Sequence, residues 1–367
     1  YDLATHTMNE FMGVRVDPID EATGGDLEKL AGPVPVVGKV EEGGSIYVLD
    51  GRLNASFKAV NLLFKNGITV LRVDKPVQGL SPGDFIVSKG PKAVVSDIAE
   101  HTGVDFLALE NNVNVGKEWT HKIKKPRIGM YQRYWSGNMD EGWTRFVLEQ
   151  FSFPYTSLKD TEIKKGDLIK TYDVIILPSD STGMIMGRIT GRYRRYLSSV
   201  PPEYQSGIGQ KGVKALKTFV EEGGTLVTLG GACDFGIEKF GLSVYNAMDN
   251  LSSKEFFCPG STIKVKFDNQ HPLAYGMPSE GLVLYWSSPA FAITPSQHNE
   301  RYETVVRYQN RDLLQSGWLI GEEHLANLAA MVNAKYGKGQ VVLIGFRTQH
   351  RSQTHGTYKL LFNALMR

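Results

Sequence analysis

The segment Val220-Glu-Glu-Gly-Gly-Thr-Leu-Val-Thr-Leu-Gly-Gly-Ala-Cys-Asp-Phe-Gly236 decides the fold class. A helix predicted over 212–222 ends at a Gly-Gly pair, and the apolar, β-rich run Thr225–Leu229 follows it. Small residues then lead to Cys233, where a second helix is predicted to begin. Helix, strand and helix in close succession are typical of a parallel sheet with helices packed on its faces.

Apolar runs elsewhere in the second half of the chain predict the other strands of this sheet. The region 261–308 is richer in β-forming residues and turns, which predicts antiparallel additions. We therefore predict one α/β domain over 126–367, with a closing helix over 357–367. Its adjacent core strands are expected at Ile128–Tyr131, Val174–Leu177, Leu226–Leu229 and Val341–Ile344.

The first third of the chain shows a similar alternation of patterns. Residues 1–32 are polar and Gly-rich without a sustained period, and we interpret them as an irregular segment. A small α/β domain is predicted over 33–125, in which the polar run 110–125 is interpreted as a linker. Strands are expected at Ser45–Asp50, Ile68–Val73, Phe85–Val87 and Val104–Leu109, with helices near 54–65 and 91–101. This alternation predicts a mostly parallel sheet.

Charge and hydropathy exclude several classes of function. The 367 residues include 41 basic and 39 acidic ones, so the net charge of +2 gives no reason to expect nucleic acid or a membrane surface as a partner. No apolar stretch approaches the roughly 20 residues that span a bilayer. No signal peptide is visible, and the chain begins at Tyr1. Cys233 and Cys258 are the only cysteines, and the sequence leaves open whether they form a disulfide.

Cys233 is the candidate nucleophile. In Leu229-Gly-Gly-Ala-Cys-Asp-Phe-Gly236 it follows a buried strand and precedes a helix, which is the setting of a nucleophile elbow. This arrangement resembles class I glutamine amidotransferases, whose last core strand is followed by His-Pro-Glu. Here the corresponding residues are Gly345-Phe-Arg-Thr-Gln-His-Arg351, so His350 is present but an arginine replaces the orienting carboxylate. His350 and His355 are the candidate bases, and we expect a degenerate site.

Nucleotide and metal sites are weaker candidates. Gly207-Ile-Gly-Gln-Lys-Gly212 matches a dinucleotide fingerprint, but the mechanism requires a strand directly before it and a loop is predicted there. We interpret it as a Gly-rich start of a helix. The eight histidines form neither His-Glu-x-x-His nor His-x-x-Glu, so we predict no metal site and no cofactor in this chain.

Aromatic residues gather where the first core strand meets the first helix of the second domain. Tyr134, Trp135 and Trp143 lie there, and Asp140 is placed in the first turn of that helix. This edge of an open α/β sheet is where ligands bind, so the four residues are candidate ligand-binding residues. The alternative is that the aromatic residues pack a loop against the core.

Several motifs, taken in order, resemble the C-terminal region of large bacterial zinc carboxypeptidase-like proteins. In those proteins a metallocarboxypeptidase domain precedes an amidotransferase-like region with a flavodoxin-like fold. The motifs are Tyr1-Asp-Leu3 to Met12-Gly-Val14, Arg127-Ile-Gly-Met-Tyr131, Met139-Asp-Glu-Gly-Trp-Thr-Arg145, Val220-Glu-Glu-Gly-Gly-Thr-Leu-Val227 and Gly345-Phe-Arg-Thr-Gln-His-Arg-Ser-Gln-Thr-His-Gly356.

The resemblance implies that the zinc ligands and the catalytic glutamate of the family lie before Tyr1, so none of them is assigned to this sequence. It also implies a periplasmic or extracellular location and the peptidase domain itself as a partner.

Three hypotheses on function follow. The first is a non-catalytic accessory region that packs against the peptidase domain, supports assembly as a homo-oligomer, or binds a small ligand or peptide. The second is a cysteine-dependent amidohydrolase that uses Cys233 with His350 or His355. The third is a carbohydrate- or peptide-binding module that uses Trp135 and Trp143. In the first case the parent protein is a zinc metallocarboxypeptidase, a hydrolase.

Overall fold

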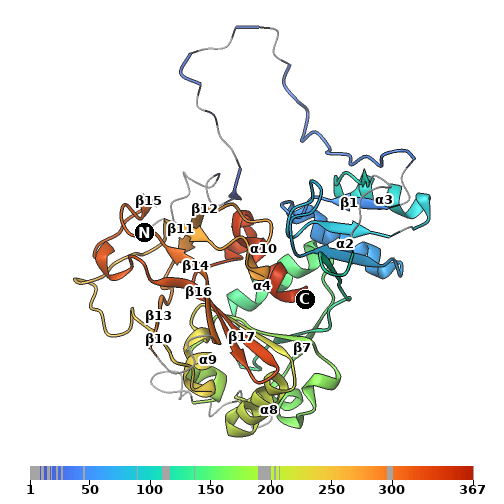
Figure 1. The fold of residues 1–367 in the computed structure, drawn as a ribbon. Helices are drawn as coiled ribbons and strands as arrows, with labels where there is room; N and C mark the ends of the chain where they lie inside the picture. Colours follow the sequence, from blue (N-terminus) through green and yellow to red (C-terminus); the bar gives the residue numbers. More distant parts are fainter. Residues whose placement is uncertain are drawn as a thin grey trace. The chain divides into compact units, whose positions relative to one another are not determined.

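A computed structural model describes residues 28–43, 46–88, 90–109, 116–135, 137–188, 207–295 and 301–366, with isolated positions before residue 28 and between residues 200 and 205. The predicted irregular segment 1–32 lies mostly outside the described residues. The chain forms two compact units, one containing Pro126–Arg367 and the other within Gly13–Lys125. Each unit has its own sheet flanked by helices, which confirms the predicted two-domain α/β architecture (Figure 1).

The larger unit is built on five parallel strands. The strands lie side by side in the order β7-β6-β8-β9-β17, and every neighbouring pair is parallel. This order is that of flavodoxin-like sheets, so the prediction of four adjacent core strands is confirmed. Their bounds are β6 Ile128–Tyr131, β7 Tyr155–Leu158, β8 Val174–Leu177, β9 Thr225–Leu229 and β17 Gly339–Ile344.

Helices cover both faces of this parallel core. Alternate residues of the strands, such as Ile175, Leu226 and Val341, face one cluster with α5, α8 and α9. On the other face α4 and α10 pack together through contacts of Phe151 and Phe362, whose ring centroids lie 4.8 Å apart (Figure 1). The helices of the unit are α4 Met139–Gln150, α5 Asp160–Lys165, α6 Thr182–Met186, α8 Gly209–Glu221, α9 Ala232–Phe240 and α10 Tyr358–Leu365. Short 3-10 helices are η2 Leu168–Lys170, η5 Pro272–Ala274, η7 Glu322–His324, η8 His350–Ser352 and η9 His355–Thr357.

Antiparallel strands extend the sheet beyond β17, as the turn-rich region 261–308 predicts. β16 pairs antiparallel with β17, and β14, β11 and β12 continue the sheet in that order. These strands place the loop after β12 beside the parallel core. Their bounds are β10 Val244–Asn246, β11 Ser261–Phe267, β12 Glu280–Tyr285, β13 Phe291–Ile293, β14 Tyr302–Tyr308, β15 Leu314–Ser316 and β16 Ala329–Tyr336.

The smaller unit differs from the prediction in the direction of its strands. Its order is β4-β1-β3-β2-β5, and every neighbouring pair is antiparallel, so the predicted parallel sheet is wrong. The reason is that no helix separates Val73 from Phe85, and strands joined without a crossover pair as antiparallel neighbours. β3 therefore inserts between β1 and β2, which makes two interlocked split βαβ units. The elements are β1 Tyr47–Leu49, α2 Asn54–Lys65, β2 Val70–Val73, β3 Phe85–Val87, α3 Lys92–Thr102, β4 Leu107–Ala108 and β5 Thr120–Lys122.

Part of the predicted linker 110–125 is a strand. β5 pairs with the edge of β2, with Lys122 opposite Leu71 and Thr120 opposite Val73. Thr120 and Ile123 are buried while His121 and Lys122 are exposed, a polar pattern that edge strands share with linkers. Residues 110–115 lie outside the described part of the chain.

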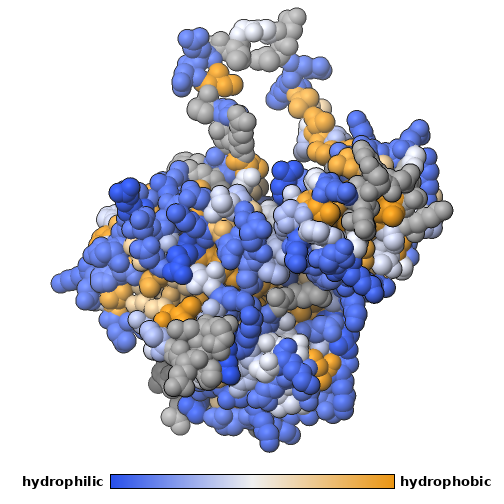
Figure 2. All heavy atoms as spheres, viewed as in Figure 1, coloured by the Kyte–Doolittle hydropathy of each residue, from blue (hydrophilic) through white to orange (hydrophobic). Residues whose placement is uncertain are grey.

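The surface in view is mainly hydrophilic, and the described apolar residues on it form small groups (Figure 2). Among the described residues, no helix is long and apolar enough to cross a membrane.

Candidate functional site

The carboxyl ends of the parallel strands meet at one edge of the sheet, here called the strand-end edge. The strand order reverses between β6 and β8, because β7 lies on one side of β6 and β8 on the other. Open α/β sheets bind ligands at such a switch point. Polar residues follow the strands at this edge, including Arg133 after β6, Ser179 and Asp180 after β8, and Arg347 and Gln349 after β17.

Asn138 fixes the start of α4 at the switch point. Its side-chain oxygen accepts hydrogen bonds from the amides of Asp140 and Glu141, at 3.0 and 3.3 Å, as an N-cap residue does. Its Nδ2 donates to the carbonyl oxygen of Ser179, 3.1 Å away. The cap therefore ties the first turn of α4 to the loop after β8.

Asp140 is the centre of a buried polar network. Its side chain is paired with Arg347, whose Nη1 lies 3.3 Å from Oδ2. The Ser179 amide and Gln349 Nε2 donate to Oδ1, at 2.8 and 3.1 Å. Burial raises the pKa of Asp140, and the charge of Arg347 with these hydrogen bonds opposes the rise. Asp140, predicted as a ligand-binding residue, thus holds three segments of the strand-end edge together.

A cavity of about 420 Å³, called the central cavity, opens beside this network. Arg133 lines it and forms an ion pair with Asp180, with 3.3 Å between Arg133 Nη1 and Asp180 Oδ2. Trp143 of α4 and Trp286 of the loop after β12 also line it. A second cavity of about 520 Å³ shares Arg133 and Asn138 with it and continues toward Tyr134 and Lys159.

Cys233 lies at the predicted elbow, as the second residue of α9. Its side chain is wholly buried, and its sulfur lies 3.4 Å from the carbonyl oxygens of Thr228 and Ile344. Burial raises the pKa of the thiol well above its usual value. No imidazole is among the hydrogen-bond partners that the described residues give this sulfur.

His350 lies between two indole rings. Its ring centroid is 4.7 Å from that of Trp143 and 5.0 Å from that of Trp286, with edge-to-face geometry. The side chain is 2% exposed, and neither ring nitrogen has a hydrogen-bond partner among the described residues. Burial, with the charges of Arg347 and Arg351, lowers the pKa of His350 to about 4. The imidazole is therefore neutral at pH 7 and is not oriented by any described carboxylate.

The contacts found for the remaining predicted site residues are with residues other than Cys233. His355 stacks on Tyr358, with 4.7 Å between the centroids, and burial lowers its pKa. Tyr134 packs edge to face with Tyr204 and lies under the Lys159 ammonium, 5.0 Å from the ring centroid. Trp135 is half-buried and is not among the residues that line these cavities, whereas Tyr134, Asp140 and Trp143 line cavities at the strand-end edge.

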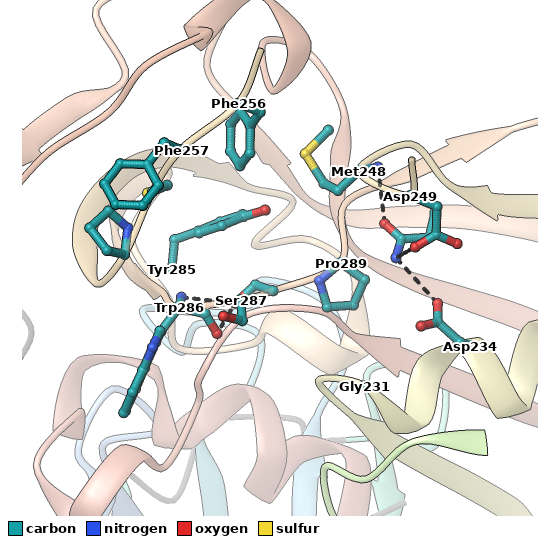
Figure 3. Close-up of a pocket in the computed structure, with 14 residues that line it drawn as sticks. Gly231, Asp234, Met248, Asp249, Phe256, Phe257, Tyr285, Trp286, Ser287 and Pro289 are labelled. Carbon is teal, nitrogen blue, oxygen red and sulfur yellow. Dashed lines mark hydrogen bonds between the residues drawn. The ribbon is translucent and has the colours of Figure 1, made fainter. Parts of the chain in front are cut away.

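Beside the elbow lies a third cavity of about 510 Å³, called the acidic cavity (Figure 3). It shares Trp286 and Ser287 with the central cavity, so the three cavities form a row along the strand-end edge. Asp234, Asp249, Phe256 and Tyr285 line it. None of these four was predicted, although Asp234 directly follows the candidate nucleophile.

The two cysteines, the glycine motif and the possible metal ligands of the sequence analysis can also be located in the structure. Cys233 and Cys258 are both free thiols. The Gly207–Gly212 motif leads into α8, and the Gly207 amide donates to Asp160 Oδ2, 3.0 Å away. Among the described residues, no group of three or more His, Cys, Asp and Glu side chains is placed to hold a metal ion.

Comparison with known proteins gives structural neighbours only. No family model and no curated protein matches the chain. A ThuA-like protein from Bacteroides uniformis is 15% identical, with 70% of this chain and 94% of that chain covered and a TM-score of 0.37. A cytoplasmic protein from Salmonella typhimurium is 10% identical over 66% and 99% of the two chains, with a TM-score of 0.38. A β-galactosidase from Bacillus circulans is 12% identical over 65% and 30%, with a TM-score of 0.35. At these scores the similarities carry no conclusion on function.

Proposed function

We propose that Pro126–Arg367 is a non-catalytic ligand-binding unit with an amidotransferase-like fold, accessory to a zinc carboxypeptidase-like protein. The observation that supports the non-catalytic role is the burial of the Cys233 side chain. A nucleophilic cysteine needs an accessible thiolate and a base, and the Cys233 sulfur is wholly buried against two carbonyl oxygens. Forming a thiolate there would place a charge next to carbonyl oxygens that repel it.

The candidate bases support the same proposal. His350 contacts Trp143 and Trp286, and its nitrogens have no carboxylate partner among the described residues. The carboxylate of the switch point, Asp140, is instead paired with Arg347. The strand-end edge thus holds a structural ion pair where a nucleophile, a base and an orienting acid would be needed for amide hydrolysis.

The cavities along the strand-end edge support the binding role. They lie at the switch point of the sheet, where this architecture binds ligands, and they combine aromatic walls with polar groups. A carbohydrate- or peptide-binding module is the second candidate, because Trp143 and Trp286 flank the central cavity. The two candidates differ in the ligand and share the absence of catalysis.

Ammonia release tests the non-catalytic role. The full chain and the Cys233→Ala variant are incubated with glutamine and with a C-terminally amidated peptide at pH 7.5. We expect equal, background release from both proteins. Release by the unaltered chain that disappears in Cys233→Ala would instead establish the cysteine-dependent amidohydrolase.

The accessory role rests on the sequence resemblance and is tested separately. The mass and N-terminal sequence of the native polypeptide show whether a peptidase domain precedes Tyr1. Fractionation of the source cells tests the proposed periplasmic or extracellular location. A native polypeptide that lacks a peptidase domain would contradict the accessory role and leave the binding role standing.

A further inference from the structure

The acidic cavity is assembled from segments that lie far apart in the sequence. Asp234 lies on α9, Asp249 follows β10, Phe256 precedes β11, and Tyr285 ends β12. Figure 3 shows these side chains around one hollow, with Asp234 and Asp249 on one side and the rings of Phe256 and Tyr285 on the other. The cavity therefore has an acidic wall and an aromatic wall.

The acidic wall carries negative charge that nearby groups leave uncompensated. Asn246 Nδ2 lies 3.3 Å from Asp234 Oδ1 and 2.9 Å from Asp249 Oδ1, so one amide bridges the two carboxylates. Of the described residues that line the cavity, none is Lys, Arg or His. Within the described part of the chain, neither carboxylate forms an ion pair. Burial, together with the charge of Asp249, raises the pKa of Asp234 to about 6, which is the response of a carboxylate without a counter-ion.

The aromatic wall presents rings and one unused hydroxyl group. Phe256 and Tyr285 pack edge to face, with 5.6 Å between their centroids. Tyr285 is 2% exposed, and its hydroxyl, which forms no hydrogen bond with a described residue, is open to the cavity and is not one of the buried polar atoms without a partner. In Figure 3 this hydroxyl points into the hollow, toward Met248. A hydroxyl at the cavity wall can donate a hydrogen bond to a ligand group or accept one from it.

We propose that the acidic cavity binds an organic ammonium cation, such as a quaternary ammonium group or a protonated amine on a small polar body. The cation would lie between the Asp234–Asp249 wall and the Phe256 ring, beside the Tyr285 hydroxyl, because carboxylates and aromatic rings both attract positive charge. The ligand body would give the Tyr285 hydroxyl its partner. This inference rests on the proposed binding function and specifies the ligand class of one cavity.

Other ligand classes fit this cavity less well. An anion would meet two carboxylates and no basic side chain among the described lining residues. Calcium takes six or more oxygen ligands, and the aromatic wall offers few. A neutral sugar could stack on the rings, but it would leave both carboxylates without a counter-charge.

The test compares charged ligands with neutral ligands of the same shape. Choline and 3,3-dimethylbutan-1-ol form one pair, and benzylamine and benzyl alcohol form the other. Calorimetric titration of the full chain at pH 7.5 is expected to show at least one cation binding about tenfold or more tighter than its neutral counterpart, as expected for one ion pair with cation–π contacts. The same titration includes calcium chloride and methyl β-galactoside.

Three variants connect the binding to the walls of the cavity. The double variant Asp234→Asn with Asp249→Asn keeps the side-chain shapes and is expected to weaken cation binding about tenfold or more. Phe256→Leu is expected to weaken it about threefold to tenfold, with little effect on the neutral ligand. Asp268→Asn is the matched control, because Asp268 is exposed and lies outside the cavity lining. Circular dichroism checks that each variant is folded.

Each outcome of the titrations supports or overturns the proposal. Equal affinity for cation and neutral counterpart, binding of neither cation, or unchanged cation binding in the double Asp→Asn variant would overturn it. Binding of only calcium or only the galactoside would also overturn it and leave the general binding role standing. Cys233-dependent ammonia release would overturn the proposed non-catalytic function without affecting the cation assignment.

Discussion

Removing the positive charge of Arg347 should destabilise the folded chain, because the buried Asp140 carboxylate loses its counter-ion. In the Arg347→Met variant Asp140, which is 5% exposed, keeps its hydrogen bonds from the Ser179 amide and Gln349 but loses its counter-ion. Breaking a buried ion pair by removing one partner costs about 3–5 kcal/mol. The Arg347 side chain is 17% exposed, and two hydrogen bonds to Asp140 remain, so we expect a loss of about 2–3 kcal/mol in the free energy of unfolding at pH 7.

The pH dependence of this loss identifies its cause. Without Arg347 the pKa of Asp140 rises further in the folded state, so the folded protein binds the proton more tightly than the unfolded one. The unfolding free energy of Arg347→Met relative to the unaltered chain should therefore recover as the pH falls from 7 to 5. Adding Asp140→Asn to Arg347→Met removes the uncompensated charge and should recover about 1 kcal/mol or more at pH 7.

Urea unfolding followed by tryptophan fluorescence measures these differences. Lys266→Met is the control, because Lys266 and Glu280 form an exposed pair 3.8 Å apart that should contribute less than about 0.5 kcal/mol. A loss in Arg347→Met as small as in the control would refute the role given to the Asp140–Arg347 pair. Losses that simply add in the double variant, or that grow as the pH falls, would refute it as well.

Three further predictions concern single residues of the strand-end edge. In the folded state the pKa of Asp234 is raised to about 6, so the free energy of unfolding falls as the pH rises from about 4 to about 6. Urea unfolding across that range should show that Asp234→Asn removes this slope. After allowance for the partial exposure of the carboxylate, the variant should be about 1 kcal/mol more stable at pH 7.5. The pKa of His350 is lowered to about 4, so the unaltered chain should lose stability as the pH falls from about 6.5 to about 4. Urea unfolding of His350→Leu should show a smaller loss of stability over the same pH interval. Gly230 has φ +51°, and a Cβ there would lie 2.6 Å from Ser179 Oγ, so Gly230→Ala should lower the melting temperature. Gly142→Ala is the control and should not lower it, because a Cβ at Gly142 meets nothing within 4 Å. Equal melting temperatures for the two alanine variants, or pH slopes unchanged in the other two, would contradict these assignments.

The parallel core was predictable because its signal is local. Val174–Leu177 and Thr225–Leu229 are short, apolar and buried, and each is bounded by turn residues. The direction of a strand pair depends on the connection, and the absence of a helix between Val73 and Phe85 was the signal that predicts antiparallel neighbours in the smaller unit. The edge strand Thr120–Lys122 escaped prediction because its polar residues face outward, as a linker's do.

The candidate site was only partly predictable. Cys233, Asp140 and Trp143 lie near the strand ends, which are visible from the order of strands and helices. Asp249 and Tyr285 reach the acidic cavity from the β-rich region, and their meeting with Asp234 depends on antiparallel pairings between distant segments. The spacing of these residues in the sequence therefore does not predict that they line one cavity.

The alkylation rate of Cys233 tests the central claim most directly. Iodoacetamide is applied to the native chain at pH 7.5, and modification of Cys233 and Cys258 is measured separately by peptide mass spectrometry, with the urea-unfolded chain as the reference for an ordinary free thiol. A wholly buried thiol with a raised pKa predicts that Cys233 reacts at least about a hundredfold more slowly in the native chain than in the unfolded one. Native alkylation of Cys233 that is faster than in the unfolded chain would show an activated thiolate and would contradict the non-catalytic assignment.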